Sequence, residues 1–240
     1  MEVQGKVVII TGASMGIGEA TARVFAEAGA QLVLAARSVD KLEAVAQRLP
    51  TQATPLVVPT DMTDQAQVKA LIETAYAHFG RVDILINNAG QAAAGPIATV
   101  SPEHYRQIIE LNLFGPLHAM QAVVPKMKAQ GGGVIINISS RVSKMAIPGI
   151  GAYASTKYAL NGLSLTAHNE LAADNIRVVL FHPGLTSTDF GKNALRTDDG
   201  SAGRPQPGNG PMPKPDSAED VARKILEAAI TEPTEMGMED

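Results

Sequence analysis

Short apolar segments alternate with longer segments of helical periodicity along most of the chain. The apolar segments are rich in Val, Ile and Leu and nearly continuous, which is typical of parallel strands covered on both faces. The predicted strands lie at 6–11, 31–36, 54–59, 82–87, 133–139 and 176–181. The predicted helices lie at 16–28, 39–48, 64–79, 101–129, 152–173 and 217–231. This alternation predicts an α/β fold with right-handed strand–helix–strand units and a doubly wound, mainly parallel sheet.

The chain length sets the expected domain organisation. The 240 residues suffice for one large α/β domain, and we expect a single domain over residues 1–240. Residues 191–216 are rich in Gly, Pro and polar residues, which predicts a surface loop or a lid over a substrate site at about 186–216. After the last predicted helix, the sequence EPTEMGMED from Glu232 contains no convincing strand.

The composition argues against several classes of protein. A net charge of −4 without a Lys/Arg cluster disfavours nucleic-acid binding. The absence of cysteine excludes disulfides and Cys-ligated metals, and the five histidines have no ligand spacing, so we expect no catalytic metal. No signal peptide is recognisable, and no apolar run approaches the ~20 residues that span a bilayer. We therefore expect a cytoplasmic protein that does not contact membranes.

The glycine-rich stretch TGASMGIG, Thr11 to Gly18, lies directly between the first predicted strand and the first predicted helix. Its glycines allow a tight turn with bare backbone close to a phosphate, and the helix offers free N–H groups and the positive end of its dipole. Glycines that only turn the chain are the alternative. The place at the first strand favours a dinucleotide site. The expected contacts come from Gly12, Ser14, Met15, Gly16, Ile17 and Gly18.

The end of the second predicted strand, LAARS, indicates which dinucleotide the chain prefers. In dinucleotide folds an acidic residue about 20 residues past the glycines holds the ribose 2′-OH of NAD. Here that position holds Ala36, and Arg37 follows with a guanidinium that suits a 2′-phosphate. The alternative is an ordinary exposed arginine neutralised by Asp40. We predict NADP(H) in preference to NAD(H).

Tyr153 and Lys157 in GAYASTKYAL are four positions apart in a predicted helix and therefore share one face. A small surface contact is one interpretation. The other is that the ammonium group lowers the pKa of the phenol from its ordinary value of about 10, so that the phenol exchanges protons near neutral pH. Ser140 ends the fifth predicted strand at the carboxyl edge of the sheet, where ligands bind, and its hydroxyl can orient a substrate oxygen.

Several motifs in one order resemble the classical short-chain dehydrogenases/reductases, from about residue 5 to residue 190. They are TGASMGIG, DMTD from Asp61, NNAG at 87–90, NLFG with Asn112, NISS ending at Ser140, YASTK with Tyr153 and Lys157, and HPGLTST from His182. Ser140 precedes Tyr153 by 13 positions (153 − 140), as in that family. The resemblance implies a single Rossmann domain and an oxidoreductase acting on a carbonyl or secondary alcohol.

The resemblance also implies roles for four catalytic residues. Tyr153 would give a proton to the substrate oxygen as hydride reaches the carbon, or remove it in reverse. Ser140 would orient that oxygen, and Lys157 would keep the phenol acidic and bind the nicotinamide ribose. Asn112 would interrupt its own helix and hold a water that connects Lys157 to solvent, although a capping or packing amide is the alternative.

Further cofactor contacts follow from the same resemblance. Asp61 and the backbone of Met62 would contact the adenine, and Asn88 would lie along the adenosine ribose. Ala89 and Gly90 would let the cofactor pass close to the backbone. The motif after the sixth strand would reach the nicotinamide amide and the diphosphate through Pro183, Gly184, Thr186 and Thr188.

The segments expected around the substrate are mostly small or apolar, namely 91–98, 141–150 and 185–216. They suit a small-molecule carbonyl or alcohol with an apolar body. An NADP(H)-binding redox sensor without turnover is the alternative function. A sugar-nucleotide epimerase fits poorly, because little chain remains after Asp216 for a substrate domain.

Two further expectations concern His182 and the oligomer. We interpret His182 as a partly buried histidine beside the cofactor rather than as a catalytic group. The family often ends in a seventh strand that builds one dimer interface, and this sequence shows no clear version of it. The helices at 101–129 and 152–173 can still pair with symmetry mates, so we expect a homodimer or homotetramer.

Overall fold

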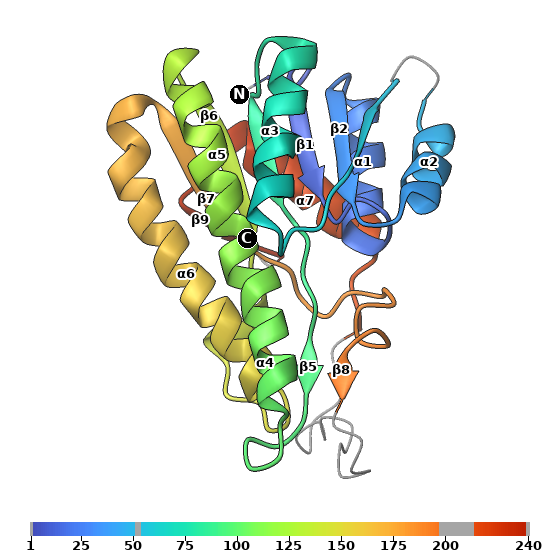
Figure 1. The fold of residues 1–240 in the computed structure, drawn as a ribbon, viewed down its shortest axis with the longest axis vertical. Coiled ribbons are helices and arrows are strands. Elements are labelled where there is room, and N and C mark those ends of the chain that lie inside the picture. Colours follow the sequence, from blue (N-terminus) through green and yellow to red (C-terminus); the bar gives the residue numbers. More distant parts are fainter. Residues whose placement is uncertain (1, 51–53, 197–213, 239–240) are drawn as a thin grey trace.

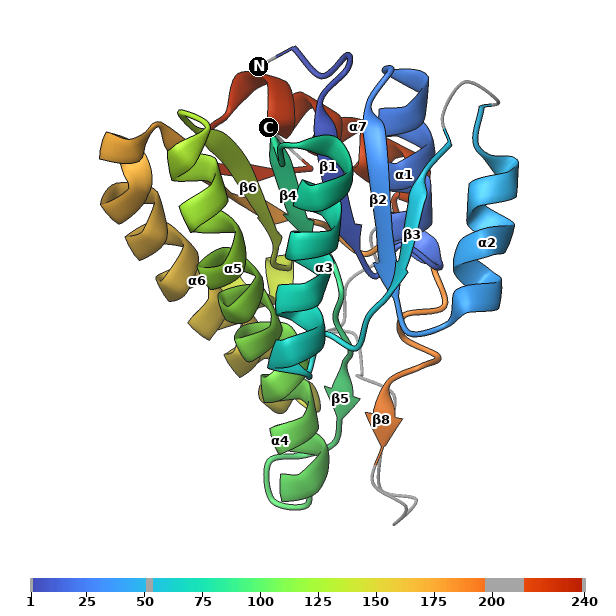
Figure 2. The same ribbon diagram turned by 45° about the horizontal axis from the view of Figure 1, so that its top comes forward.

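The computed structural model describes residues 2–50, 54–196 and 214–238, and within them the centre is a seven-stranded parallel sheet (Figures 1 and 2). The strand order is β3-β2-β1-β4-β6-β7-β9, and each neighbouring pair is parallel. The strands are β1 (Val7–Thr11), β2 (Gln31–Ala36), β3 (Leu56–Pro59), β4 (Ile84–Asn87), β6 (Gly133–Ile138), β7 (Ile176–His182) and β9 (Glu235–Gly237). The six predicted strands are confirmed.

Helices cover both faces of the sheet, which confirms the doubly wound Rossmann architecture. One face carries α1 (Gly16–Glu27), α2 (Val39–Arg48) and α7 (Ala218–Thr231), and the other carries α3 (Gln65–Phe79), α5 (Gly115–Ala129) and α6 (Gly151–Leu171) (Figure 1). Alternate residues of β1 point to opposite faces: Val8 and Ile10 pack toward α1, whereas Val7 and Ile9 pack toward α3. This double coverage explains why the central strands are almost continuously apolar.

The starts of several helices follow from their capping residues. The carboxylate of Asp64 accepts hydrogen bonds from the backbone N–H groups of Ala66 and Gln67 at the start of α3. Ser217 caps α7 in the same way, through the N–H of Asp220. Ser38 precedes α2 as predicted, but its side chain makes no capping hydrogen bond.

The long predicted helix at 101–129 is not a single α-helix. Ser101 caps α4 (Pro102–Ile109), a π-helical turn η1 follows at Glu110–Phe114, and α5 continues to Ala129. A π-helical turn contains an extra residue and often marks a functional site. Asn112 lies in η1, as the predicted local break of its helix requires.

The expectation of no strand after the last helix is wrong. Residues Glu235–Gly237 form β9, which extends the sheet in parallel with β7, and Leu180 stands opposite Glu235 in the register. The strand has three residues and carries neither β-branched nor aromatic side chains, so its sequence gives little strand signal. Pairing with β7 and the burial of Met236, which is 8% exposed, stabilise it instead.

The predicted loop or lid at about 186–216 lies partly outside the described residues, which omit 197–213. Its first part contains β8 (Leu195–Arg196), which pairs in parallel with β5 (Ala93–Ala94) to form a second, two-stranded sheet. At its other end Asp216 forms a β-bridge with Thr186. Both ends of the loop are therefore held against the part of the chain that contains the expected site.

Candidate active site

The glycine-rich turn leads from β1 into α1 with little space for side chains. Gly12 and Gly16 have φ of +66° and +59°, a conformation that side chains disfavour. A Cβ on Gly18 would lie 2.2 Å from the carbonyl oxygen of Gly12 and 2.6 Å from Nδ2 of Asn88. Met15 at the N-cap position offers no side-chain hydrogen bond, so the first N–H groups of α1 keep no side-chain cap. This combination fits an anion such as a diphosphate.

The segment after β4 is tied to the same turn. Nδ2 of Asn88 donates to the carbonyl of Thr11 at 2.9 Å, and Oγ1 of Thr11 accepts from the backbone N–H groups of Asn88 and Ala89 at 3.0 and 3.1 Å. Thr11 was not among the predicted site residues. Its place as the last residue of a strand before a glycine turn was the available signal.

Asn112 and Lys157 meet at Gly90. A Cβ on Gly90 would lie 3.2 Å from Oδ1 of Asn112 and 3.7 Å from Nζ of Lys157. Asn112 is fully buried: its Oδ1 accepts from the N–H of Gln91 at 2.9 Å, and its Nδ2 donates to Thr156 Oγ1 at 3.0 Å. Nζ of Lys157 donates to the carbonyl of Ile138 at 2.8 Å, at the carboxyl end of β6.

Tyr153 and Lys157 are buried, with 8% and 4% exposure, so the surface-contact interpretation is wrong. The Lys157 ammonium lies 6.0 Å from the centroid of the phenol ring. Burial raises the pKa of Tyr153 to about 12, against which a hydrogen bond with Ser140 acts, and burial lowers the pKa of Lys157 to about 8. The expected lowering of the phenol pKa is therefore absent from this structure, because desolvation outweighs the other influences. The phenol keeps its proton at neutral pH.

Ser140 directs its side chain differently from its neighbour Ser139. Oγ of Ser140 accepts from the N–H of Val142 at 3.3 Å, at the start of the 3₁₀ turn η2 (Arg141–Lys144), so its own proton remains free to donate. Oγ of Ser139 donates to Oδ1 of Asn161 at 2.6 Å inside the protein. The structure thus brings Ser140, rather than Ser139, to Tyr153.

The segment after β7 closes over these residues. Oγ1 of Thr186 donates to the carbonyl of Gly184, and the side chain of Thr188 lies 3.4 Å from the Cβ position of Gly16. This contact brings the predicted diphosphate residue to the glycine-rich turn. The ring of Phe190 lies 5.6 Å from that of Tyr153, centroid to centroid, and covers it. Phe190 lies in the segment 185–216 expected around the substrate, but it was not predicted individually, since its loop has no periodicity to place it.

The expected adenine end lies apart from the catalytic group. Arg37 follows β2 and is exposed, and among the described residues no ion pair joins it to Asp40. Oδ1 of Asp61 accepts from the N–H and the hydroxyl of Thr63 at 2.9 and 2.8 Å. Met62 is buried, with its side chain in the core and its carbonyl oxygen close to Gly115, so the expected backbone contact with adenine stays a prediction.

His182 is fully buried rather than partly buried as expected, with 2% exposure at the end of β7. In the described part of the chain, no group of three His, Asp or Glu side chains could hold a metal ion. None of the described helices combines the length and the apolar character that crossing a bilayer requires.

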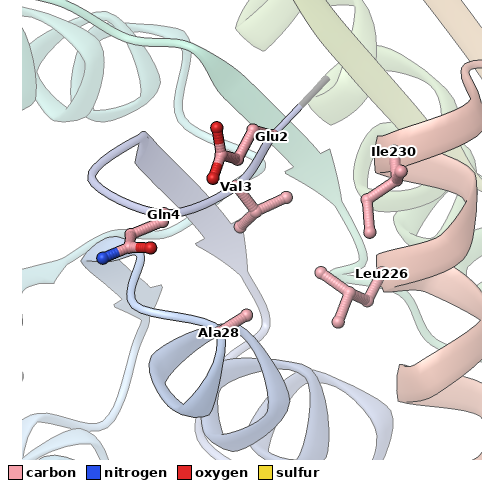
Figure 3. Close-up of a pocket in the computed structure, with 6 residues that line it drawn as sticks. All are labelled: Glu2, Val3, Gln4, Ala28, Leu226 and Ile230. Atoms are coloured by element: carbon pink, nitrogen blue, oxygen red, sulfur yellow. The ribbon is translucent and has the colours of Figure 1, made fainter.

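Among the cavities of the described residues are two that bear on the location of the site. A cavity of about 560 Å³ lies where Val3, Leu226 and Ile230 face one another, and none of the predicted site residues lines it (Figure 3). A second, of about 360 Å³, lies between α4 and the first turn of α6 and is lined by Ile97, Tyr105 and Ala152 among others. Since Ala152 precedes Tyr153, the second cavity adjoins the candidate site.

Comparison with known proteins agrees with this geometry. The family model described as short chain dehydrogenase matches residues 6–199. An uncharacterized oxidoreductase of Staphylococcus saprophyticus is 40% identical over 190 residues, which cover 78% of this chain and 77% of that protein. A short-chain dehydrogenase/reductase from Burkholderia phymatum, solved in complex with NAD, aligns with a TM-score of 0.88 at 26% identity over 99% of this chain and 90% of that one.

A second solved structure extends the comparison. It is an alcohol dehydrogenase from Thermococcus sibiricus in complex with 5-hydroxy-NADP, with a TM-score of 0.82 and 30% identity over 98% of this chain and 96% of that one. The matched family model covers the glycine-rich turn and all four predicted catalytic positions. The chain belongs to the short-chain dehydrogenase family.

Proposed function

We propose that this oxidoreductase exchanges hydride between NADP(H) and a carbonyl or secondary alcohol, with Tyr153 as the acid or base. The observation that carries the proposal is the buried Tyr153 phenol, hydrogen-bonded to Ser140 and one helical turn from Lys157. A protonated phenol beside a second hydroxyl donor suits proton delivery to a carbonyl oxygen.

A nicotinamide dinucleotide fits the residues along the carboxyl edge of the sheet. The bare glycine turn and the start of α1 suit its diphosphate, and the lack of a side chain at Gly90 leaves room beside Lys157. When bound, the cofactor supplies or accepts the hydride. The residues that would hold it are Gly12, Ser14, Met15, Gly16, Ile17, Gly18, Arg37, Asp61, Met62, Asn88, Ala89, Gly90, Tyr153, Lys157, Pro183, Gly184, Thr186 and Thr188.

The chain's own residues manage the proton. In reduction, the substrate oxygen accepts hydrogen bonds from Ser140 and Tyr153, and Tyr153 transfers its proton to that oxygen as hydride reaches the carbon. In oxidation the phenolate removes the proton from the alcohol. Lys157 stabilises the phenolate by its charge, and Asn112, held beside it at Gly90, is placed to support a path that returns a proton from solvent.

Apolar side chains shape the substrate site. Phe190 packs against the Tyr153 ring, with the two ring centroids 5.6 Å apart. Ala93 of β5 belongs to the same apolar cluster as Tyr153. We propose a small-molecule carbonyl or alcohol with an apolar body as substrate. The Thermococcus sibiricus relative, an alcohol dehydrogenase, is consistent with this class.

Replacing Tyr153 by Phe tests the function directly. Removal of the acid should lower the turnover of carbonyls with NADPH by about 10²–10⁴-fold while the protein still binds NADPH. Tyr158→Phe is the matched control, because Tyr158 lies in the same helix, is half exposed and should leave turnover unchanged. Binding of NADPH without turnover by the wild-type protein, over a broad panel of carbonyls, would favour the redox-sensor alternative instead.

We further propose a single catalytic domain that assembles into a homodimer or homotetramer through α5 and α6 and works in the cytoplasm without nucleic-acid or membrane partners. Large apolar side chains on this side of the molecule are exposed, including Phe114, Tyr158 and Leu165. Pairing of α5 and α6 with their symmetry mates would bury them. Light scattering should give a mass of two or four chains, and Leu165→Glu should reduce it.

A further inference from the structure

A polar cluster behind Ser140 connects the catalytic end of β6 to the C-terminal strand. Its members are Ser143 and Lys144 of η2, His182 of β7 and Glu235 of β9. The reaction proposed above uses none of them. They nevertheless contact one another in an unbroken chain from Glu235 to the backbone of Ser140.

One end of the cluster holds the backbone of Ser140. Its carbonyl oxygen accepts from Oγ of Ser143 at 2.6 Å and from the N–H of Ser143 at 3.0 Å. Nδ1 of His182 lies 3.3 Å from the same carbonyl oxygen and 3.3 Å from Oγ of Ser143. These contacts fix the peptide of Ser140 from behind while its hydroxyl faces Tyr153.

The other end of the cluster belongs to β9. Nε2 of His182 lies 2.8 Å from Oε1 of Glu235, and the ammonium of Lys144 contacts the same carboxylate oxygen. The side chain of His182 is 3% exposed, whereas those of Glu235 and Lys144 are 36% and 58% exposed. The imidazole therefore lies between two elements, with Nδ1 toward the Ser140 carbonyl and Nε2 toward the Glu235 carboxylate, which also contacts the last residue of η2.

We infer that His182 and Glu235 are positioning residues that hold η2 and thereby aim the Ser140 hydroxyl at the substrate oxygen. The inference rests on the function proposed above. Catalytic groups need placement to within about 0.5 Å, and a 1 Å misplacement costs about 10²-fold in rate. The three-residue strand β9, at the edge of the sheet, thus supports the active site, although neither His182 nor Glu235 touches the substrate.

Replacing Glu235 by Ala removes the carboxylate at the outer end of the polar cluster. The kcat of carbonyl reduction per folded molecule should fall about tenfold, a fraction of the effect of a full 1 Å misplacement. The dissociation constant for NADPH should change less than kcat, because the glycine turn that would hold the diphosphate follows β1 rather than β6 or β7. Glu235→Gln keeps an acceptor for His182 and Lys144 and should recover kcat to within about threefold of wild type.

Thr234→Val is the matched control on the same segment. Oγ1 of Thr234 lies 3.2 Å from Nε2 of His168, and Nδ1 of His168 lies 2.8 Å from the carbonyl oxygen of Val178. Neither Thr234 nor His168 belongs to the cluster. This variant should lower the unfolding midpoint and leave kcat unchanged. If Glu235→Ala behaves like Thr234→Val, with lower stability and wild-type kcat, the positioning role is refuted.

Amide hydrogen exchange provides a readout that does not depend on catalysis. The amides of residues 141–145 should exchange faster in Glu235→Ala and in His182→Asn than in wild type, but not in Thr234→Val. Unchanged exchange in both cluster variants would overturn the inference. If the variants show this exchange pattern but the wild-type protein reduces no carbonyl, the proposed function alone is overturned.

Discussion

Gly90 faces the side-chain amide of Asn112 so closely that a Cβ at position 90 would lie 3.2 Å from Oδ1 of Asn112 and 3.7 Å from Nζ of Lys157. The first distance is shorter than an ordinary van der Waals contact, and Asn112 is held by hydrogen bonds to Gln91 and Thr156. The amide therefore has little room to move. Gly90 is where the predicted cofactor segment and the predicted proton-transfer residues come together.

Gly90→Ala should consequently impair catalysis without unfolding the protein. We expect kcat/KM to fall about tenfold or more, because the methyl group displaces Asn112 or narrows the space beside Lys157. Steady-state kinetics with NADPH and a reducible carbonyl measure it. Gly162→Ala is the control: among the described residues, nothing beyond its own helix backbone and chain neighbours lies within 4 Å of its Cβ position in α6, so it should stabilise the protein by about 0.5–1 kcal/mol and leave kcat/KM unchanged. Wild-type kinetics in Gly90→Ala would contradict the assigned contact.

Arg37→Ala should change cofactor choice. If the exposed guanidinium binds the 2′-phosphate, its loss removes a charge-assisted hydrogen bond worth about 1.5–3 kcal/mol, so NADPH should bind about 10–100-fold more weakly. NADH binding should be unchanged. Fluorescence titration with both nucleotides measures the two constants. Arg48→Ala, at the far end of α2 and paired with Glu19, should alter neither. A wild-type protein that prefers NADH would refute the NADP(H) proposal.

Lys157 should make stability depend on alkaline pH. Burial lowers its pKa from 10.5 to about 8, so between these values the unfolded chain holds a proton that the folded protein has released. Stability due to this group therefore rises with pH across that window, and the full cost of the buried charge applies below it. Lys157→Met should raise the free energy of unfolding at pH 7 by about 1–3 kcal/mol while abolishing turnover.

Urea denaturation at pH 7, 8, 9 and 10 checks this prediction. The stability advantage of Lys157→Met over wild type should shrink as the pH rises. Lys41→Met, at an exposed position of α2, should show no such trend. An advantage that is constant with pH would mean that the ammonium is not desolvated in the folded protein.

Hydrophobic periodicity was enough to predict the six long strands and the order of helices, because their apolar runs report burial directly. The strand at Glu235–Gly237 could not be found in this way. Its stability comes from pairing with β7, a contact about 55 residues distant along the chain, as the partners Leu180 and Glu235 show. Periodicity could not reveal β5 and β8 either, because each has only two residues. Their pairing also joins segments that are distant along the chain.

The candidate site, too, could be predicted from the sequence only in part. Spacing placed Tyr153, Lys157 and Ser140 together, since one helical turn and one strand end determine their positions. Spacing could not predict the direction of the Tyr153 pKa. That direction depends on how much protein surrounds the phenol, including Phe190, which reaches it from a loop without periodicity. His182 was likewise interpreted in isolation, because its partner Glu235 lies on the strand that the sequence does not reveal.

The π-helical turn at Glu110–Phe114 makes residue count as important as residue identity. Deleting one residue from it would allow α4 and α5 to join as an uninterrupted α-helix. Because the extra residue is accommodated within the turn, its loss would change the direction of the side chains of the turn itself, Asn112 included. Such a homologue could retain every motif letter, Asn112 included, yet carry that amide away from Gly90 and Lys157. When sequences of this family are aligned, a single gap at this position should be read as loss of the site.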